Sequence, residues 1–276
     1  AKEADIVNDI STTQDLSTAL NSKHVNENQL LSLWSACFNR LKAVLEKNRN
    51  LFPLANMFVS MLVVVSTAIL TRAAGNKKTI DDFIKNKLAA LPAIYVLIQA
   101  NFKNSSRRGA HVDSMWYGHP PAELLQRPLM LIIDKACAVK IEQAIEDYVN
   151  TKSTTFEKFL AYYKHHKPDN GDFIIDKASV KKELDISKDS TINKIAFALS
   201  LHHKIICFQE GKCEFHSFQS HFNALEETLN KKTMGNDMKT LLNDIKATIN
   251  TAISLKQVKT IMGPRITTPT TSRRLN

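Results

Sequence analysis

The sequence predicts a mainly helical protein, and three observations support that prediction. The chain has 276 residues but only seven glycines and eight prolines, so few positions interrupt a helix. Apolar side chains recur at three- and four-residue spacings over long segments. Hydrophobic residues make up 43% and charged residues 23% of the chain, a balance typical of folded globular proteins. We expect a basic helical N-terminal body, a C-terminal winged-helix-like unit of helices with a small β-hairpin, and flexible terminal arms.

Residues 1–28 are expected to form an acidic N-terminal arm. They are rich in Ser, Thr, Asn and Asp and carry two basic and five acidic groups, a net charge of −3. Their few apolar residues predict one short helix near residues 6–20. This polar start shows no secretory signal, and the four cysteines of the chain are scattered. Both features predict a reducing compartment such as the cytoplasm, proteins of viral particles included.

Residues 29–150 are expected to form a basic helical domain. Apolar residues with helical spacing begin at Leu30 and end before Pro53. The next run, residues 51–71, contains no charged side chain. Such a run is long enough to span a bilayer, but a helix buried on all faces has the same composition. We expect the buried helix, because Asn56 and several hydroxyl side chains interrupt the run and no second segment matches its length.

The rest of this domain is expected to contain two further helices around a loop. Thr79 is expected to cap a helix that opens with two aspartates. A loop rich in basic, aromatic, glycine and proline residues covers 103–121, and Pro128 is expected to introduce a helix from about Leu129 to Val149. The polar residues 150–155 follow as the predicted domain boundary.

Residues 156–255 are expected to form a winged-helix-like domain with trailing helices. Gly211 lies between two β-prone runs, a pattern that indicates a hairpin. Two trailing helices are expected at about 222–229 and 238–253. The core of the unit has the order helix, strand, helix, helix, strand, strand, at residues 156–166, 172–175, 179–184, 190–203, 205–209 and 213–217.

The second long helix of this unit does not have the composition of a DNA-reading helix. Its middle, from Ile195 to Leu201, is apolar apart from Ser200, so it leaves little polar surface for base edges. Residues 171–255 carry eleven basic and eleven acidic groups, whereas DNA-binding domains are strongly basic. We therefore expect this unit to serve in packing or in contact with another protein rather than to bind duplex DNA.

Residues 256–276 are expected to form a basic flexible tail. They carry five basic groups and no acidic group. An acidic arm at one end and a basic tail at the other predict a homo-oligomer built by exchange of arms between neighbouring copies. The alternative is two frayed ends without a role.

The sequence contains no motif that predicts an enzyme or a cofactor. It lacks the G-x-S-x-G elbow, the P-loop and the G-x-G-x-x-G fingerprint. His165 and His166, between two lysines, are expected to form a solvated helix end. A group of histidines and cysteines is an alternative zinc site, although its spacing matches no common zinc module. We assign no metal ligand. That group contains His202, His203, Cys207, Cys213 and His216.

The strongest functional signal is a set of cations in the N-terminal domain that is followed by aromatic residues. Basic groups neutralise phosphates, and aromatic rings stack on bases, which are the requirements for binding single-stranded RNA. An ordinary basic surface is the alternative. The predicted contacts are Arg72, Lys77, Lys78, Lys85, Lys103, Arg107, Arg108, Trp116 and Tyr117.

Three functions follow from these patterns. The first is a non-enzymatic RNA-binding protein that coats or packages single-stranded RNA and self-associates, as viral nucleoproteins of similar size and charge do. The second is a winged-helix scaffold or adaptor that contacts other proteins. The third is a membrane-associated protein that uses residues 51–71.

Overall fold

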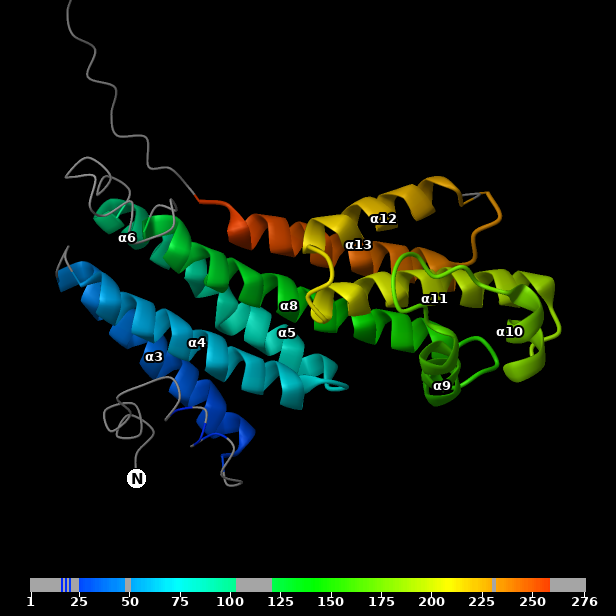
Figure 1. Cartoon of the computed structure of the whole chain (residues 1–276), viewed down its shortest axis with the longest axis horizontal. Helices are drawn as coiled ribbons and strands as arrows, with labels where there is room; N and C mark the ends of the chain where they lie inside the picture. The colour runs from blue at the N-terminus through cyan, green and yellow to red at the C-terminus, as the bar shows by residue number, and fades with distance from the viewer. Residues whose placement is uncertain are drawn as a thin grey trace, which may run out of the picture.

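The computed structural model describes residues 25–47, 51–102, 121–229 and 232–258, together with Leu16, Thr18 and Leu20. The expectation of a mainly helical protein is confirmed for these residues, and none of them forms a β-strand. The helices are α3 (Glu27–Lys47), α4 (Phe52–Ala73), α5 (Lys77–Asn86), the 3-10 turn η1 (Leu88–Ala90), α6 (Leu91–Phe102), α8 (Pro121–Asn150), α9 (Phe156–His166), α10 (Lys177–Glu183), α11 (Asp189–Gln209), α12 (Phe215–Glu227) and α13 (Asn236–Lys256) (Figure 1).

The N-terminal half is a bundle of α3, α4, α5 and α6 with α8. Helix α3 packs on α4, while α4, α5 and α6 each pack on α8. Apolar residues of α3 recur on one face, and Leu30, Leu33, Trp34 and Leu41 are buried there. The indole Nε1 of Trp34 donates a hydrogen bond to the buried Ser66 hydroxyl of α4 at 2.9 Å. This bond satisfies both polar groups inside an otherwise apolar core.

The uncharged run of residues 51–71 lies in α4, and half of that helix is buried by its neighbours. Eleven of the 22 residues of α4 are buried, among them Phe58, Leu62 and Ile69. Within the described part of the chain, α4 is the one helix whose length and composition would suit a membrane span. A core helix passes the same test, and α3, α5 and α8 all pack against α4.

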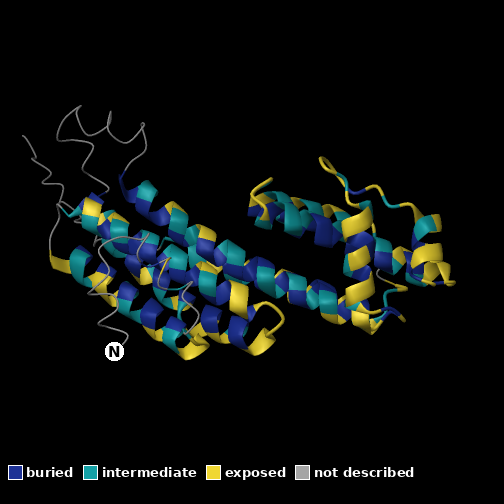
Figure 2. Ribbon diagram, turned by 60° about the horizontal axis from the view of Figure 1, so that its bottom comes forward, coloured by how far each residue is buried: buried dark blue, intermediate teal, exposed yellow. Residues whose placement is uncertain are grey.

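Helix α8 is the longest element and joins the two halves of the molecule. It begins at Pro121, contains Pro128, and runs for 30 residues. The prediction that Pro128 introduces the helix was therefore wrong. A proline inside a helix removes one hydrogen bond and crowds the carbonyl one turn earlier, but the buried residues Leu125, Leu129 and Ile132 pack on both sides of it and hold the helix together. Figure 2 shows buried and half-buried residues along most of this helix.

The C-terminal half consists of α9 to α13, which pack around the second part of α8. Helices α9, α11 and α13 contact α8, whereas α10 and α12 contact α11. Helix α13 runs antiparallel to α8, because Lys256 pairs with Asp134 at one end and Asp237 pairs with Lys152 at the other. The turn at residues 151–155 lies at the predicted domain boundary. The division into domains stays a prediction.

The predicted β-hairpin was wrong. Residues 205–209 continue α11, and residues 215–217 begin α12. Gly211, with φ +75°, ends α11 instead of turning a hairpin: its N–H donates to the Phe208 carbonyl, and Lys212 N–H donates to the Cys207 carbonyl. These two bonds form a Schellman motif, in which glycine takes the left-handed position after a helix.

Without the hairpin, the winged-helix arrangement is absent from the described residues. The expected strand at 172–175 is unpaired chain between α9 and α10. The expected helices do form, although α11 is longer than predicted and α12 begins seven residues earlier. Apolar spacing explains the extension of α11, since Ile205 and Phe208 are buried and follow Leu201 at helical spacing.

The terminal regions fall largely outside the described residues. This applies to the acidic arm except Leu16, Thr18, Leu20 and residues 25–28, and to the basic tail from residue 259 onward. Leu16, Thr18 and Leu20 are helical, and they lie at the end of the predicted short helix.

Candidate nucleic-acid interface

Four of the nine predicted RNA contacts lie in the described residues, all on α4 or α5. Arg72 is in the last turn of α4, while Lys77, Lys78 and Lys85 are on α5. The other five fall outside the described residues. They are Lys103, Arg107, Arg108, Trp116 and Tyr117.

The turn between α4 and α5 brings three of these cations to one corner of the bundle. Gly75 takes a φ of +82°, a conformation that glycine adopts without strain. Asn76 then caps α5, because its side chain accepts a hydrogen bond from Thr79 N–H at 3.3 Å. The prediction that Thr79 is the cap was wrong: Thr79 is buried, and its hydroxyl donates to Glu27 Oε1 at 2.9 Å. The reversal leaves Arg72 five positions before Lys77 in the chain, with Arg72 directed to the Val25 carbonyl and Lys77 to Asp147 of α8.

The buried side of α5 fixes the direction of its lysines. Ile80, Phe83 and Ile84 pack inward, so Lys78 and Lys85 lie on the exposed side. An ion pair of 2.9 Å between Asp81 and Lys140 ties this helix to α8. Lys85 lies seven positions after Lys78, about 10 Å along the helix axis. Exposed Asp82 lies between them.

The four cations differ in the ion pairs and hydrogen bonds that their side chains make. Lys77 pairs with Asp147 at 3.9 Å, but both side chains are exposed, so the pair is weak. Arg72 donates to the Val25 carbonyl oxygen, which leaves its charge unneutralised. Within the described chain, neither Lys78 nor Lys85 has an acidic group within 4.0 Å. These two lysines are therefore available to an anion.

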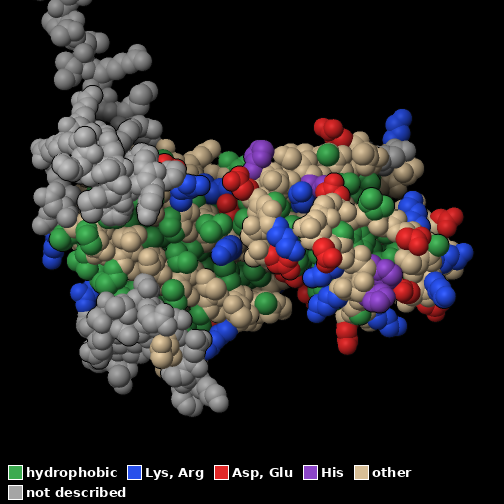
Figure 3. Space-filling view, viewed as in Figure 1, with side chains coloured by type: hydrophobic (Ala, Val, Ile, Leu, Met, Phe, Trp, Pro, Cys, Tyr) green, Lys and Arg blue, Asp and Glu red, His purple; other side chains and the backbone are tan. Residues whose placement is uncertain are grey.

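The C-terminal half carries both signs of charge. Figure 3 shows lysines, arginines and acidic side chains interspersed over the part of the surface formed by α9 to α12. Several lysines there are neutralised by neighbours, such as Lys246 by Glu226 at 2.6 Å and Lys212 by Glu210 at 3.1 Å. This half presents no continuous basic surface in that view.

The histidines and cysteines between residues 202 and 216, considered above as zinc ligands, do not converge on one point. His202 is buried with its ring edge-on to Phe159 and Tyr163, and His216 is exposed on α12. Burial, with a smaller contribution from neighbouring His203, lowers the pKa of His202 to about 4. A buried ring among aromatic side chains is a core residue rather than a ligand.

His203 and Cys207 belong to a separate polar cluster beside the chain at residues 169–172. His203 Nδ1 shares a hydrogen bond with the Tyr163 hydroxyl at 2.9 Å, and its Nε2 lies 2.9 Å from the Gly171 carbonyl oxygen. Burial raises the pKa of the Cys207 thiol, so its reactive thiolate is disfavoured. The cluster fixes the loop before α10 to α11.

Another group of potential ligands is assembled by the fold and was missed at the sequence level. Among the described residues, His165, His166 and Glu183 form the one set of three His, Cys, Asp or Glu whose ligand atoms all lie within 4.8 Å of one another. Glu183 is 17 residues away on α10, and no motif spacing connects it to the histidines. The adjacent histidines were the available signal.

Comparison with protein-family models, with curated proteins and with solved structures finds no match for this chain.

Proposed function

We propose that this chain is a non-enzymatic RNA-binding protein that coats single-stranded RNA and self-associates, in the manner of a nucleoprotein. The observation that carries the proposal is the position of Lys78 and Lys85 on the exposed side of α5, without an acidic partner among the described residues, beside Arg72. The chain as a whole has a net charge of +10, which favours a polyanionic partner. The cytoplasm, viral particles included, is the proposed location.

Single-stranded RNA fits this surface better than duplex DNA does. Reading a duplex requires a polar helix face that enters the major groove, whereas binding a single strand requires only cations and stacking surfaces. The helix α5 supplies cations, and the predicted aromatic contacts Trp116 and Tyr117 follow in sequence. Binding of this kind is independent of base sequence and weakens steeply with salt.

The test is a salt titration of binding to a fluorescent oligouridine, followed by anisotropy. Each phosphate contact on a single strand contributes about 0.7 to the slope of log affinity against log salt. We expect the K78A/K85A double variant to reduce that slope by about 1.4 and to bind more weakly at low salt. The matched control is K158A/K239A, which removes two exposed lysines from α9 and α13.

Two results would contradict this proposal. The first is wild-type protein that does not bind the oligonucleotide at low salt. The second is an equal loss of slope in both double variants, which would mean that net charge and not α5 determines binding. The variant R107A/R108A extends the same measurement to the predicted loop, where unchanged affinity and slope would remove that loop from the site.

A second candidate function is a scaffold that contacts another protein through the C-terminal half. The observation in its favour is Ile174, which is 94% exposed in the loop before α10. Isolated apolar side chains are common on surfaces, but one so fully exposed between two structured helices suits insertion into a partner. If the purified protein is a monomer that does not bind RNA, this second function is favoured. I174D would then be the first variant to test.

A further inference from the structure

Two neighbouring histidines at the end of α9 lie beside a glutamate at the end of α10. The ligand atoms of His165, His166 and Glu183 lie within 4.8 Å of one another. Consecutive helix residues are about 100° apart around the axis, so their side chains normally diverge. Here the two imidazole rings are 4.7 Å apart, centroid to centroid, and nearly perpendicular.

We propose that His165, His166 and Glu183 bind a transition-metal dication, with Zn²⁺ as the best match. Two imidazoles and one carboxylate are a ligand set that zinc uses in proteins, with the fourth position taken by water. Calcium and magnesium prefer oxygen ligands, so the two histidines argue against them. His165 and Glu183 are exposed, and solvent can therefore supply the remaining ligand.

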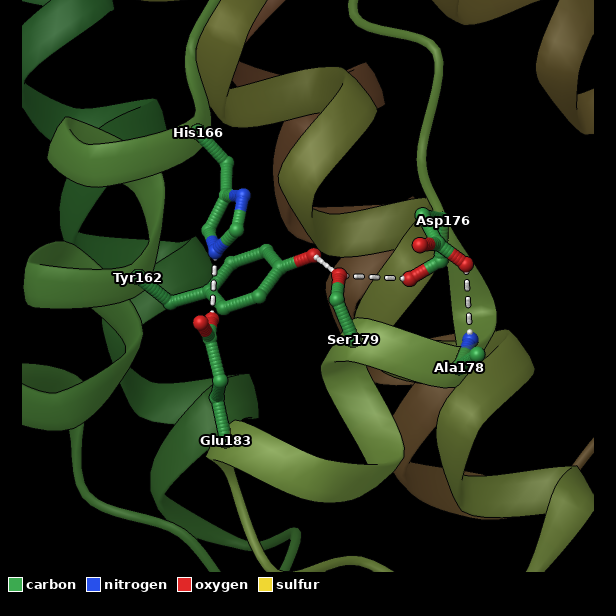
Figure 4. A network of polar contacts seen from close by, with 6 residues as sticks. All are labelled: Tyr162, His166, Asp176, Ala178, Ser179 and Glu183. Atoms are coloured by element: carbon green, nitrogen blue, oxygen red, sulfur yellow. Dashed lines mark hydrogen bonds and ion pairs between the residues drawn. The ribbon is translucent and has the colours of Figure 1, made fainter.

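A network of polar contacts holds His166 in position (Figure 4). The ring of Tyr162 stacks on the His166 ring at 4.2 Å, and the Tyr162 hydroxyl is hydrogen-bonded to the Ser179 hydroxyl of α10. Ser179 in turn donates to the Asp176 carbonyl oxygen at 2.8 Å. Supporting contacts of this kind orient metal ligands and raise the affinity of a site.

The glutamate already faces the histidine that it would join at the metal. His166 Nε2 and Glu183 Oε2 are directly hydrogen-bonded (Figure 4). Ligand atoms around tetrahedral zinc lie about 3.3 Å apart, so the carboxylate must withdraw slightly to admit the ion. The Glu183 side chain is 41% exposed, which leaves it room to do so.

Neighbouring lysines oppose the binding of a cation only weakly. Lys164 and Lys167 flank the histidines but are exposed, so solvent and salt screen their charges. The carboxylate of Glu183 is itself a ligand and supplies the compensating negative charge. A bound ion would join the C-terminal end of α9 to the C-terminal end of α10, which is only seven residues long.

The test uses the full chain after chelator treatment and titrates it with ZnCl₂ in a calorimeter. We expect one Zn²⁺ per chain and a higher melting temperature with metal than without it. E183Q preserves the shape of the side chain but removes the anionic ligand, and we expect binding at least about tenfold weaker. H165A/H166A should abolish this binding. Circular dichroism and melting without metal establish that each variant is folded.

Three single variants serve as controls. H216A and E227Q remove an exposed histidine and an exposed glutamate of α12, and C207S removes a thiol of α11. All three should bind zinc as the wild type does. Co²⁺ absorption provides a second readout, because nitrogen and oxygen ligands give no thiolate charge-transfer band. The proposal is overturned if the wild type takes up no stoichiometric zinc, if H165A/H166A binds unchanged, or if C207S is the variant that loses binding.

Discussion

At the scale of single residues, His202 couples the stability of the fold to pH. Its ring is 1% exposed and packed against Phe159 and Tyr163, and its pKa falls from 6.5 to about 4. Below pH 6.5, His202 is protonated in the unfolded chain, whereas in the folded chain it stays neutral until about pH 4. The free energy of unfolding therefore decreases as the pH falls through this window.

The variant H202F should remove this part of the pH dependence. Between pH 7 and pH 4.5 we expect the wild type to lose about 2 kcal/mol more stability than H202F, as measured by urea unfolding at both values. H216Q, which removes an exposed histidine, should behave as the wild type does. An identical pH dependence in H202F and the wild type would show that His202 does not control it.

The sequence predicted the surroundings of His202 only in part. The aromatic face of α9 follows from the spacing of Phe156, Phe159, Tyr162 and Tyr163, which predicts a packed helix. That the His202 ring lies edge-on to Phe159 and Tyr163, whereas His203 bonds the Tyr163 hydroxyl, depends on how α11 is rotated against α9. No local pattern reports that rotation. For the same reason, the sequence did not predict that Glu183 lies beside His166, because that contact depends on the packing of α10.

At the scale of elements, an ion pair joins the end of α8 to the start of α13. The Lys152 side chain is 8% exposed, pairs with Asp237, and lies 4.7 Å from the centre of the Tyr148 ring. Burial, and to a smaller extent Lys194, lowers the pKa of Lys152. Removing one partner of such a pair leaves the other charge uncompensated.

We expect K152A to lower the free energy of unfolding by about 2–3 kcal/mol, less than for a fully buried pair because Asp237 stays partly hydrated. Urea titration at pH 7 measures this change. The control is K42A on α3, whose exposed pair with Glu46 is 4.0 Å long and should contribute no more than about 0.5 kcal/mol. Equal effects of the two variants would contradict a role for Lys152 in holding α13 on α8.

The positions of most helices were predictable, whereas some of their ends were not. Helical apolar spacing identified α3 because it buries one face along its length, whereas α11 is buried on most sides in its middle. The sequence Glu210-Gly211 is compatible with a hairpin turn and with a helix C-terminus, since both use a left-handed glycine. The deciding factor was the burial of Ile205 and Phe208, which is a tertiary effect.

At the scale of the whole molecule, α8 makes the two halves interdependent. Helices α11 and α13 pack on α8, although they lie beyond the predicted domain boundary. The cluster of Arg72, Lys77 and Lys78 was predictable because a short turn joins them. The pair between Lys77 and Asp147 was not, since it links residues seventy positions apart through the packing of α5 on α8.

Self-association is expected to depend on the terminal arms. Deleting residues 264–276 should leave the helical fold intact and reduce self-association, because it removes three of the five cations that would meet a neighbour's acidic arm. Sedimentation velocity measures the change, and a full-length variant with Arg265, Arg273 and Arg274 changed to Ser separates charge from length. An unaltered sedimentation profile in both variants would show that the tail has no such role.

The uncharged run of residues 51–71, most of α4, also matters while the protein is being synthesised. This helix is covered partly by α8, whose last residue follows the end of α4 by 77 positions (150 − 73). At ribosomal rates of about 5–20 residues per second, that interval lasts about 4–15 s. During it, the nascent chain presents an apolar helix that α3 can cover but α8 cannot yet cover, so chaperone capture at this stage would affect the yield of folded protein.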